Sequence, residues 1–130
     1  MATDNGHYFA DIFTASRGSD DFRRVLGTAE HVQLVIMTLA PGEEIGEEVH
    51  PGNDQVLLAV EGRGVSVLEG ERRPFEAGYC VLVPQGTLHN FINTGDEPLR
   101  LVTLYGPPDH RPGTVHKTKA DADRDTGDHP

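Results

Sequence analysis

The sequence predicts a small all-β barrel, and two observations in its middle part carry that prediction. Glycines recur at intervals of eight, eight, eight and nine residues, at positions 62, 70, 78, 86 and 95. The segments between them are short and rich in aliphatic and β-branched residues, without the 3.6-residue period of an amphipathic helix. Short strands separated by turn residues at this spacing are typical of an antiparallel sandwich or barrel.

Apolar runs between the turns give the expected strands, which are Val32–Leu39, Gln55–Val60, Val65–Leu68, Tyr79–Val83, His89–Ile92 and Leu99–Tyr105. Glu69–Glu71 and Asn93–Asp96 have the composition of hairpin turns. Cys80 lies inside an apolar run with no histidine near it in the sequence. We therefore expect Cys80 to be a small core residue rather than a nucleophile.

One minor helix is expected in the N-terminal part, at Ser19–Leu26. Ser19 or Asp20 has a side chain suited to capping the first turn of a helix. In that helix Phe22, Val25 and Leu26 would share one face.

The length of 130 residues predicts a single domain. We expect residues 1–30 to form strands or a short helix, residues 31–106 to form the barrel, and residues 107–130 to form an irregular C-terminal tail. The last ten residues are polar, so we expect them to be disordered. His110 and His116 lie in this tail and are candidates for closing over the barrel mouth or docking on a partner subunit.

The charge balance argues against two classes of partner. There are 21 Asp and Glu residues against 11 Lys and Arg, a formal net charge of −10, whereas nucleic acids and anionic membranes require clustered Lys and Arg. No apolar run is long enough to cross a bilayer, and the first residues lack the pattern of a signal peptide. Cys80 is the single cysteine and gives no indication of an oxidising compartment. The sequence thus predicts a cytoplasmic protein that binds neither nucleic acid nor membrane.

Side chains of the metal-ligand type gather near the ends of predicted strands. Glu48 and His50 are two residues apart, so on an extended strand both side chains point to the same face. His89 follows the turn Pro84–Gly86, which would direct it toward the mouth of a barrel. Two imidazoles and a carboxylate from different strands can hold a divalent transition metal with open coordination positions. The spacing alone fits a solvent-exposed glutamate and a structural histidine as well.

The same residues belong to two spaced motifs. The first has intervals of five, one, four and six residues between Gly42, Glu48, His50, Gln55 and Gly62. The second has intervals of five, one, two and three residues between Gly78, Pro84, Gly86, His89 and Asn93. With these motifs the chain resembles the cupin superfamily, in particular small single-domain bacterial cupins of the mannose-6-phosphate isomerase-like subgroup. The second motif matches at every position, whereas the first keeps the spacing and changes two ligand types.

The resemblance implies a double-stranded β-helix, or jelly-roll barrel, with metal ligands at Glu48, His50, Gln55 and His89. The family ligand set is three histidines and one glutamate, so here a glutamate stands first and a glutamine third. Because an amide is a weaker ligand than a carboxylate, we expect a triad of Glu48, His50 and His89, with Gln55 ligating loosely or holding a water. Such a nitrogen and oxygen set favours iron, manganese, nickel or zinc over calcium or magnesium.

The resemblance further implies an enzyme that uses this metal on a small oxygen-bearing molecule, of the isomerase, dioxygenase or lyase type. Glu48, if it is not a ligand, is then the candidate catalytic base. Two alternatives stay open: a non-catalytic small-ligand or sensor barrel with a structural or absent metal, and a metal-free barrel in which Glu48 and His50 form an ion pair.

The sequence also bears on the charge of a possible substrate and on the oligomeric state. A phosphosugar requires cations, and those near the motifs in the sequence are Arg63, Arg72 and Arg73, with Lys117 and Lys119 farther away. The resemblance also implies a homodimer. Residues 1–30 are candidates for pairing across its subunits, because they contain the apolar pairs Tyr8–Phe9 and Ile12–Phe13.

Overall fold

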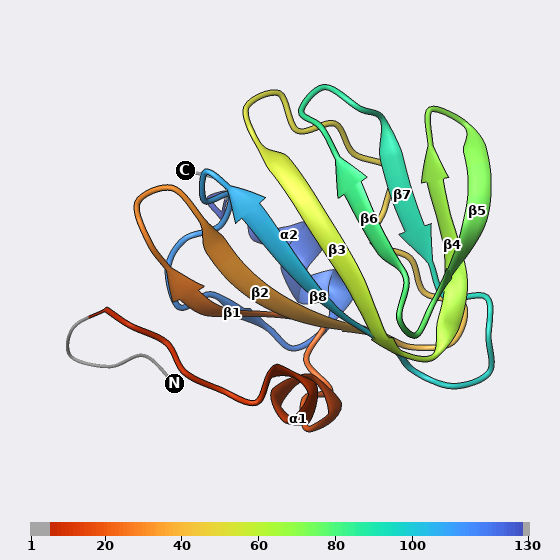
Figure 1. Ribbon diagram of the computed structural model, residues 1–130, viewed down its shortest axis with the longest axis horizontal. Helices are drawn as coiled ribbons and strands as arrows, with labels where there is room; N and C mark the ends of the chain where they lie inside the picture. The colour runs from red at the N-terminus through yellow and green to blue at the C-terminus, as the bar shows by residue number, and fades with distance from the viewer. Residues whose placement is uncertain (1–5, 129–130) are drawn as a thin grey trace.

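The computed structural model describes residues 6–128, which form two antiparallel β-sheets and two short helices (Figure 1). The strands are β1 (Arg23–Thr28), β2 (Gln33–Leu39), β3 (Asp54–Glu61), β4 (Arg63–Leu68), β5 (Glu71–Glu76), β6 (Cys80–Val83), β7 (His89–Ile92), β8 (Leu99–Gly106) and β9 (Val115–His116). The helices are α1 (Ile12–Arg17) and α2 (Lys119–Arg124). The all-β prediction is confirmed, although the two sheets do not join into one closed hydrogen-bonded barrel.

The larger sheet has six strands in the order β6-β3-β8-β2-β1-β9, and the smaller has three in the order β5-β4-β7. β8 lies inside the larger sheet, where it pairs with β2 on one side and with β3 on the other. In this register Tyr105 of β8 stands between Gln33 of β2 and Gln55 of β3. Three side chains from distant parts of the sequence therefore form one row across the sheet.

The main core lies between the two sheets. Val35, Met37 and Leu39 alternate along β2 and point into it, as the period of a strand requires. The smaller sheet contributes Phe75 and Phe91, whose ring centroids are 4.9 Å apart at a steep angle. This core holds the two sheets together by burial of apolar surface.

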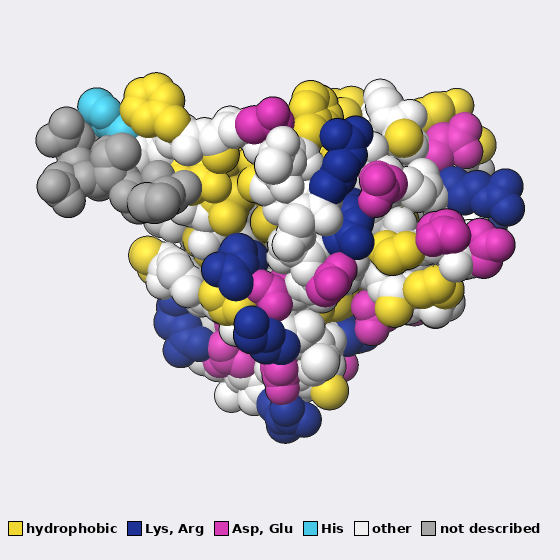
Figure 2. All heavy atoms as spheres, turned by 90° about the horizontal axis from the view of Figure 1, so that it is seen from below, with side chains coloured by type: hydrophobic (Ala, Val, Ile, Leu, Met, Phe, Trp, Pro, Cys, Tyr) yellow, Lys and Arg dark blue, Asp and Glu magenta, His cyan; other side chains and the backbone are white. Residues whose placement is uncertain are grey.

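A second apolar cluster on the outer face of the larger sheet explains why β2 is apolar at nearly every position. Ile36, Val60 and Val102 are buried there, and Ile12 of α1 packs against them. α1 thus covers the face opposite the core, and β2 is buried on both sides. Seen from this side, the surface carries Lys and Arg side chains interspersed with Asp and Glu (Figure 2). Ile12 therefore packs within its own chain. The pairing of residues 1–30 across a homodimer stays a prediction.

The helix predicted at Ser19–Leu26 is wrong in position. The helix lies earlier, at Ile12–Arg17, where the Asp11 side chain caps it by accepting a hydrogen bond from the Thr14 backbone N–H at 3.2 Å. Arg23–Thr28 instead forms β1, because its backbone finds partners in both β2 and β9. Tertiary pairing here overrides the local helical pattern. Among residues 6–128, neither helix has the length and apolar character needed to span a bilayer.

The tail at residues 107–128 is irregular in most of its length, but it contains the short strand β9 and the short helix α2. β9 pairs with β1, and the Thr118 side chain caps α2 by accepting from the Asp121 backbone N–H at 3.1 Å. Ala122 packs against the main core, and Asp128 is buried. The expected disorder of the last ten residues stays a prediction, and residues 129–130 lie outside the described part.

Cys80 is exposed at the start of β6, so its expected core role is wrong. Val81 and Val83 of the same strand point toward the core instead. Tyr79 and Leu82 are large apolar side chains that remain exposed beside Cys80.

Candidate metal centre

Glu48 and His89 are direct neighbours across an antiparallel backbone pair. The Glu48 N–H donates to the His89 carbonyl, and the His89 N–H donates to the Glu48 carbonyl, both at 2.9 Å. The segment after β2 continues this pairing along β7, because the Ile45 N–H donates to the Phe91 carbonyl at 2.9 Å. Directly opposed residues present their side chains on the same face, so Glu48 and His89 are held side by side by the backbone.

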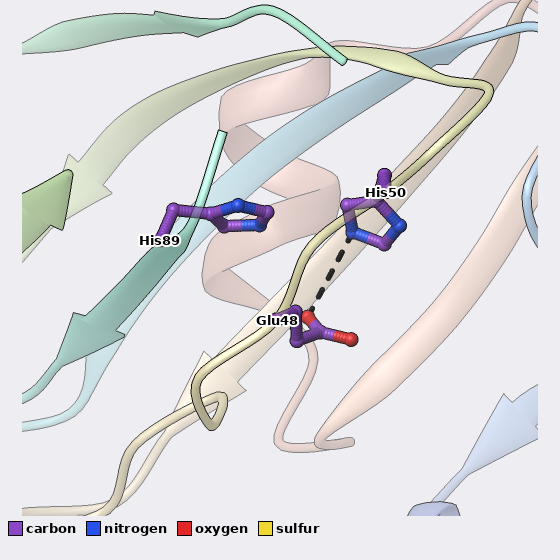
Figure 3. Close-up of side chains that lie close together, drawn as sticks. All are labelled: Glu48, His50 and His89. Atoms are coloured by element: carbon purple, nitrogen blue, oxygen red, sulfur yellow. Dashed lines mark ion pairs between the residues drawn. The ribbon is translucent and has the colours of Figure 1, made fainter. Parts of the chain in front are cut away.

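His50 completes the cluster from the same segment as Glu48 (Figure 3). Its Nε2 lies 3.9 Å from Glu48 Oε1, and its ring centroid lies 5.1 Å from that of His89. Potential ligand atoms of Glu48, His50 and His89 all lie within 4.8 Å of one another. The Gly86 N–H donates to the His50 carbonyl at 2.8 Å, which joins the turn before β7 to this segment. The structure therefore brings together the three residues of the predicted triad.

Gln55, the fourth predicted ligand, is buried on β3 beside Tyr105. Its Nε2 donates to Thr103 Oγ1 at 2.9 Å, which leaves the amide oxygen without a hydrogen-bond partner in the described structure. Tyr105 is the register partner of Gln55 on β8, and its ring centroid lies 5.7 Å from that of His50. Gln55 is thus connected to the cluster through Tyr105, and its role as a fourth ligand stays a prediction.

Three potential metal-binding atoms of the predicted ligand set are buried without a hydrogen-bond partner. Within residues 6–128 these atoms are His50 Nε2, His89 Nε2 and Gln55 Oε1. Buried polar atoms without partners cost free energy, and more than nine in ten such groups are normally satisfied. A cation bound by these lone pairs would remove that cost, so the residues present fit a metal ion.

The second nitrogen of each histidine is oriented by a separate contact. His89 Nδ1 lies 2.8 Å from the Thr87 carbonyl, which places the proton on Nδ1 and leaves the Nε2 lone pair for a ligand. His50 Nδ1 lies 3.7 Å from Asp109 Oδ1. Contacts of this kind orient metal-binding histidines and raise their basicity.

The pKa of His50 is raised above its usual value. Burial lowers it, but the Asp109 carboxylate and the charge of Glu48 together outweigh burial. A proton therefore competes for Nε2 of His50 more strongly than it would at an isolated imidazole.

Asp109 is a residue that the sequence motifs do not reveal. It lies in the segment after β8, which the Gln33 side chain holds against the barrel. Gln33 Oε1 accepts from the backbone N–H groups of Asp109 and His110 at 3.1 and 3.0 Å, and its Nε2 donates to the His110 carbonyl at 2.7 Å. Buried Gln33 thus positions the carboxylate that faces His50.

His110 and His116 are both buried and contribute no ligand to the triad. His110 Nδ1 lies 2.5 Å from Asp128 Oδ2, and its ring packs edge-on to Tyr105. His116 Nε2 lies 3.0 Å from Asp125 Oδ2. The segment carrying them packs on its own barrel, whereas docking on a partner subunit stays a prediction.

Fold and cluster together define a class: a small jelly-roll domain with two histidines and a glutamate gathered between its sheets. The sequence model of the cupin domain matches residues 35–105, which is more than half of the chain. The chain therefore belongs to the cupin family, whose members commonly bind divalent metals. The finer assignment to a mannose-6-phosphate isomerase-like subgroup stays a prediction.

Individual proteins and solved structures are also similar to this chain. The uncharacterised protein YrkC of Bacillus subtilis is 42% identical over 122 residues, a match that covers 88% of this chain and 65% of YrkC, just under two-thirds of its length. The crystal structure of BH2720 from Bacillus halodurans superposes with a TM-score of 0.89 at 38% identity, over 93% of this chain and 96% of that one. Glucose-6-phosphate isomerase of Pyrococcus horikoshii is 41% identical over 68 residues, 47% of this chain and 35% of that enzyme.

Proposed function

We propose that this cupin binds a divalent transition metal through Glu48, His50 and His89, with Gln55 as a weaker fourth donor. The observation that carries the proposal is the set of buried, unpartnered donor atoms on His50, His89 and Gln55. Two imidazoles and a carboxylate favour iron, manganese, nickel or zinc over ions that prefer oxygen shells.

We propose further that the metal serves an enzyme acting on a small oxygen-bearing molecule. A divalent ion at this position would polarise or acidify an oxygen-bearing group of the substrate. Isomerisation is the first reaction to test, because it is the activity named for the related Pyrococcus protein; dioxygenase and lyase reactions are the next. Glu48 is the most exposed member of the triad, with 30% of its side chain accessible, so it is the residue placed to exchange a proton if it does not coordinate.

The alternative is a barrel that binds a small molecule without turnover. The burial of His50 and His89 favours it, since a metal closed in by protein ligands is typical of structural sites. An open coordination position on the loaded protein would favour the enzyme, and a closed one would favour the alternative.

The test is metal content by mass spectrometry on untagged protein purified without chelators. Each of the variants Glu48→Ala, His50→Ala and His89→Ala should have metal content lowered about tenfold or more, because each change removes a ligand. Gln55→Ala should lower metal content less. His31→Ala is the matched control, since His31 is an exposed histidine that is not part of the cluster. Equal metal content in all variants would contradict the ligand assignment.

A further inference from the structure

His110, in the segment after β8, is a buried histidine with a carboxylate on each side of its ring. Its Nδ1 lies 2.5 Å from Asp128 Oδ2, and its Nε2 lies 3.5 Å from Asp109 Oδ2. The side chains of His110, Asp109 and Asp128 are only 1%, 9% and 2% exposed. Because these groups are largely shielded from water, their contacts with one another are electrostatically stronger than contacts at the surface.

The second oxygen of Asp109 extends these contacts to the candidate metal centre. Asp109 Oδ1 lies 3.7 Å from Nδ1 of His50, so the carboxylate bridges two histidines. Tyr105 packs along both of them, since its ring lies edge-on to those of His50 and His110, with centroids 5.7 and 5.1 Å away. Histidines and carboxylates thus alternate from a predicted ligand to the C-terminal part of the chain, in the order His50, Asp109, His110 and Asp128.

Asp128 fixes the far end of this row. Its Oδ1 accepts hydrogen bonds from Thr114 Oγ1 at 3.2 Å and from the Arg111 N–H at 3.4 Å, and its backbone carbonyl accepts from the same N–H at 3.1 Å. The positive charge of Arg23 also acts on both Asp128 and His110. Asp128 is therefore held by groups that do not belong to the candidate metal centre.

The same segment contains a second buried histidine with a carboxylate partner, but this pair does not lead to the triad. His116 Nε2 lies 3.0 Å from Asp125 Oδ2. The other ring nitrogen of His116 faces Arg23 Nη1 at 3.3 Å rather than a carboxylate. Within residues 6–128, no hydrogen bond or ion pair joins His116 or Asp125 to His50.

We infer that His110 and Asp128 are positioning residues of the metal centre, which hold His50 in orientation through Asp109. The inference rests on the proposed function, because His50 acts there as a metal ligand. A carboxylate behind a metal-binding histidine orients its ring, and it does so only when it is itself held in place. Here His110 contacts that carboxylate, and Asp128 fixes the ring of His110. A ligand that is oriented before the metal arrives loses less conformational freedom on binding.

The experiment is measurement of zinc affinity by competition with a chelator. Asp109→Asn removes the direct partner of His50 and should weaken zinc binding tenfold to about a hundredfold. Asp128→Asn, which acts two contacts farther away, should weaken it about threefold to tenfold, at or below the lower end of that range. Asp125→Asn is the matched control, because it changes a carboxylate bound to a buried histidine in the same segment, and it should leave zinc affinity unchanged.

A double variant separates positioning of His50 from a general loosening of the segment. If Asp128 acts through Asp109, adding Asp128→Asn to Asp109→Asn should weaken zinc binding no further. A full additional loss would overturn the inference, as would unchanged zinc affinity in Asp128→Asn or an equal loss in Asp125→Asn.

The metal-free protein supplies an independent readout. If the parent binds no zinc, the proposed function fails, and the ring-nitrogen NMR shifts of His50 still test the positioning. These shifts should change in Asp128→Asn and stay as in the parent in Asp125→Asn; identical shifts in all three proteins would overturn the inference. If Asp128→Asn does not fold, His110→Phe keeps a ring against Tyr105 without the nitrogens and should also weaken zinc binding about threefold to tenfold. Parent-like zinc affinity in His110→Phe would equally overturn the inference.

Discussion

Gln55 places an amide where a carboxylate would add negative charge beside the triad. Its amide nitrogen is held by Thr103, so its oxygen is the atom available to a cation. The neutral side chain limits the electrostatic contribution to metal affinity, and it also avoids burying a second charge when the metal is absent.

Gln55→Glu should therefore tighten metal binding and weaken the metal-free fold. A carboxylate is the stronger ligand, so we expect metal affinity to rise by about tenfold. Without metal, the buried carboxylate should lower the melting temperature at neutral pH. Chelator competition gives the affinity, and thermal unfolding with and without metal gives the stability. Weaker metal binding by Gln55→Glu would show that Gln55 is outside the ligand shell.

His110 is a buried histidine whose pKa is lowered to about 4, first by burial and then by the charge of Arg23, despite the Asp128 carboxylate beside it. It is therefore neutral at neutral pH and donates its Nδ1–H to Asp128. The unfolded chain gains a proton at this histidine near the ordinary pKa of 6.5, whereas the folded chain does so only near 4.

The stability of metal-free protein should thus fall as the pH drops from about 6.5 to 4, since the unfolded state binds the proton first. The His110 contribution to that fall is up to about 3 kcal/mol for a shift from 6.5 to about 4. His110→Asn keeps a donor for Asp128 and removes the titration, so its urea unfolding free energy should change less across this window than that of the parent. Parallel pH profiles for the two proteins would contradict the assignment.

At the scale of elements, one side chain of β2 anchors the backbone of the segment after β8 at Asp109 and His110. Gln33 makes three hydrogen bonds to the backbone of Asp109 and His110, and all three are buried. Gln33→Leu should cost about 2 kcal/mol or more, because it leaves buried backbone groups without partners. Hydrogen exchange should show faster exchange at the amides of Asp109 and His110, and metal affinity should fall because Asp109 no longer faces His50. Unchanged exchange at these two amides would contradict this role of Gln33.

The three residues of the triad were predictable because the motifs that contain them are short. Glu48 and His50 are two residues apart, and His89 follows Gly86 by three. One backbone pair, between Glu48 and His89, then brings the two short segments together. Asp109 and Gln33 were not predictable, since their contribution to the centre depends on contacts between residues far apart in the sequence. No motif or spacing near these residues in the sequence indicates their role at the centre.

β6 shows a second reason for failure. The predicted strand Tyr79–Val83, which includes β6, is apolar or nearly so throughout, and its alternation therefore contains no polar residue to tell which face is outside. The helix prediction for Ser19–Leu26 failed for a different reason. A capping residue and a helical spacing were present, but β2 and β9 provided backbone partners that a helix would have left unused.

At the scale of the whole molecule, the candidate ligands come from both sheets. Gln55 lies on β3 of the larger sheet and His89 on β7 of the smaller, with Glu48 and His50 in the segment between β2 and β3. A metal bound by all four would tie the sheets together where no hydrogen-bonded strand pair joins them.

Removing the metal should therefore destabilise the whole domain in one transition. With free metal at a hundred times its dissociation constant, binding to the folded state alone adds about 2.7 kcal/mol. Chemical unfolding before and after chelation measures this difference. The double variant Glu48→Ala/His50→Ala should be insensitive to chelator, whereas His31→Ala should respond like the parent. A parent whose stability does not change on chelation would contradict the cross-link.

The contact between His110 and Asp128 has a consequence for the order of events during synthesis. The candidate ligands have all left the ribosome once His89 has emerged, but the group that orients His50 arrives with Asp109, and the segment that carries it is secured only when Asp128 follows. Because domains fold as units, the nascent chain would expose His50 without its orienting carboxylate until then. We therefore expect loading with the proposed metal to be a late event, set by the arrival of a segment that supplies no ligand of its own.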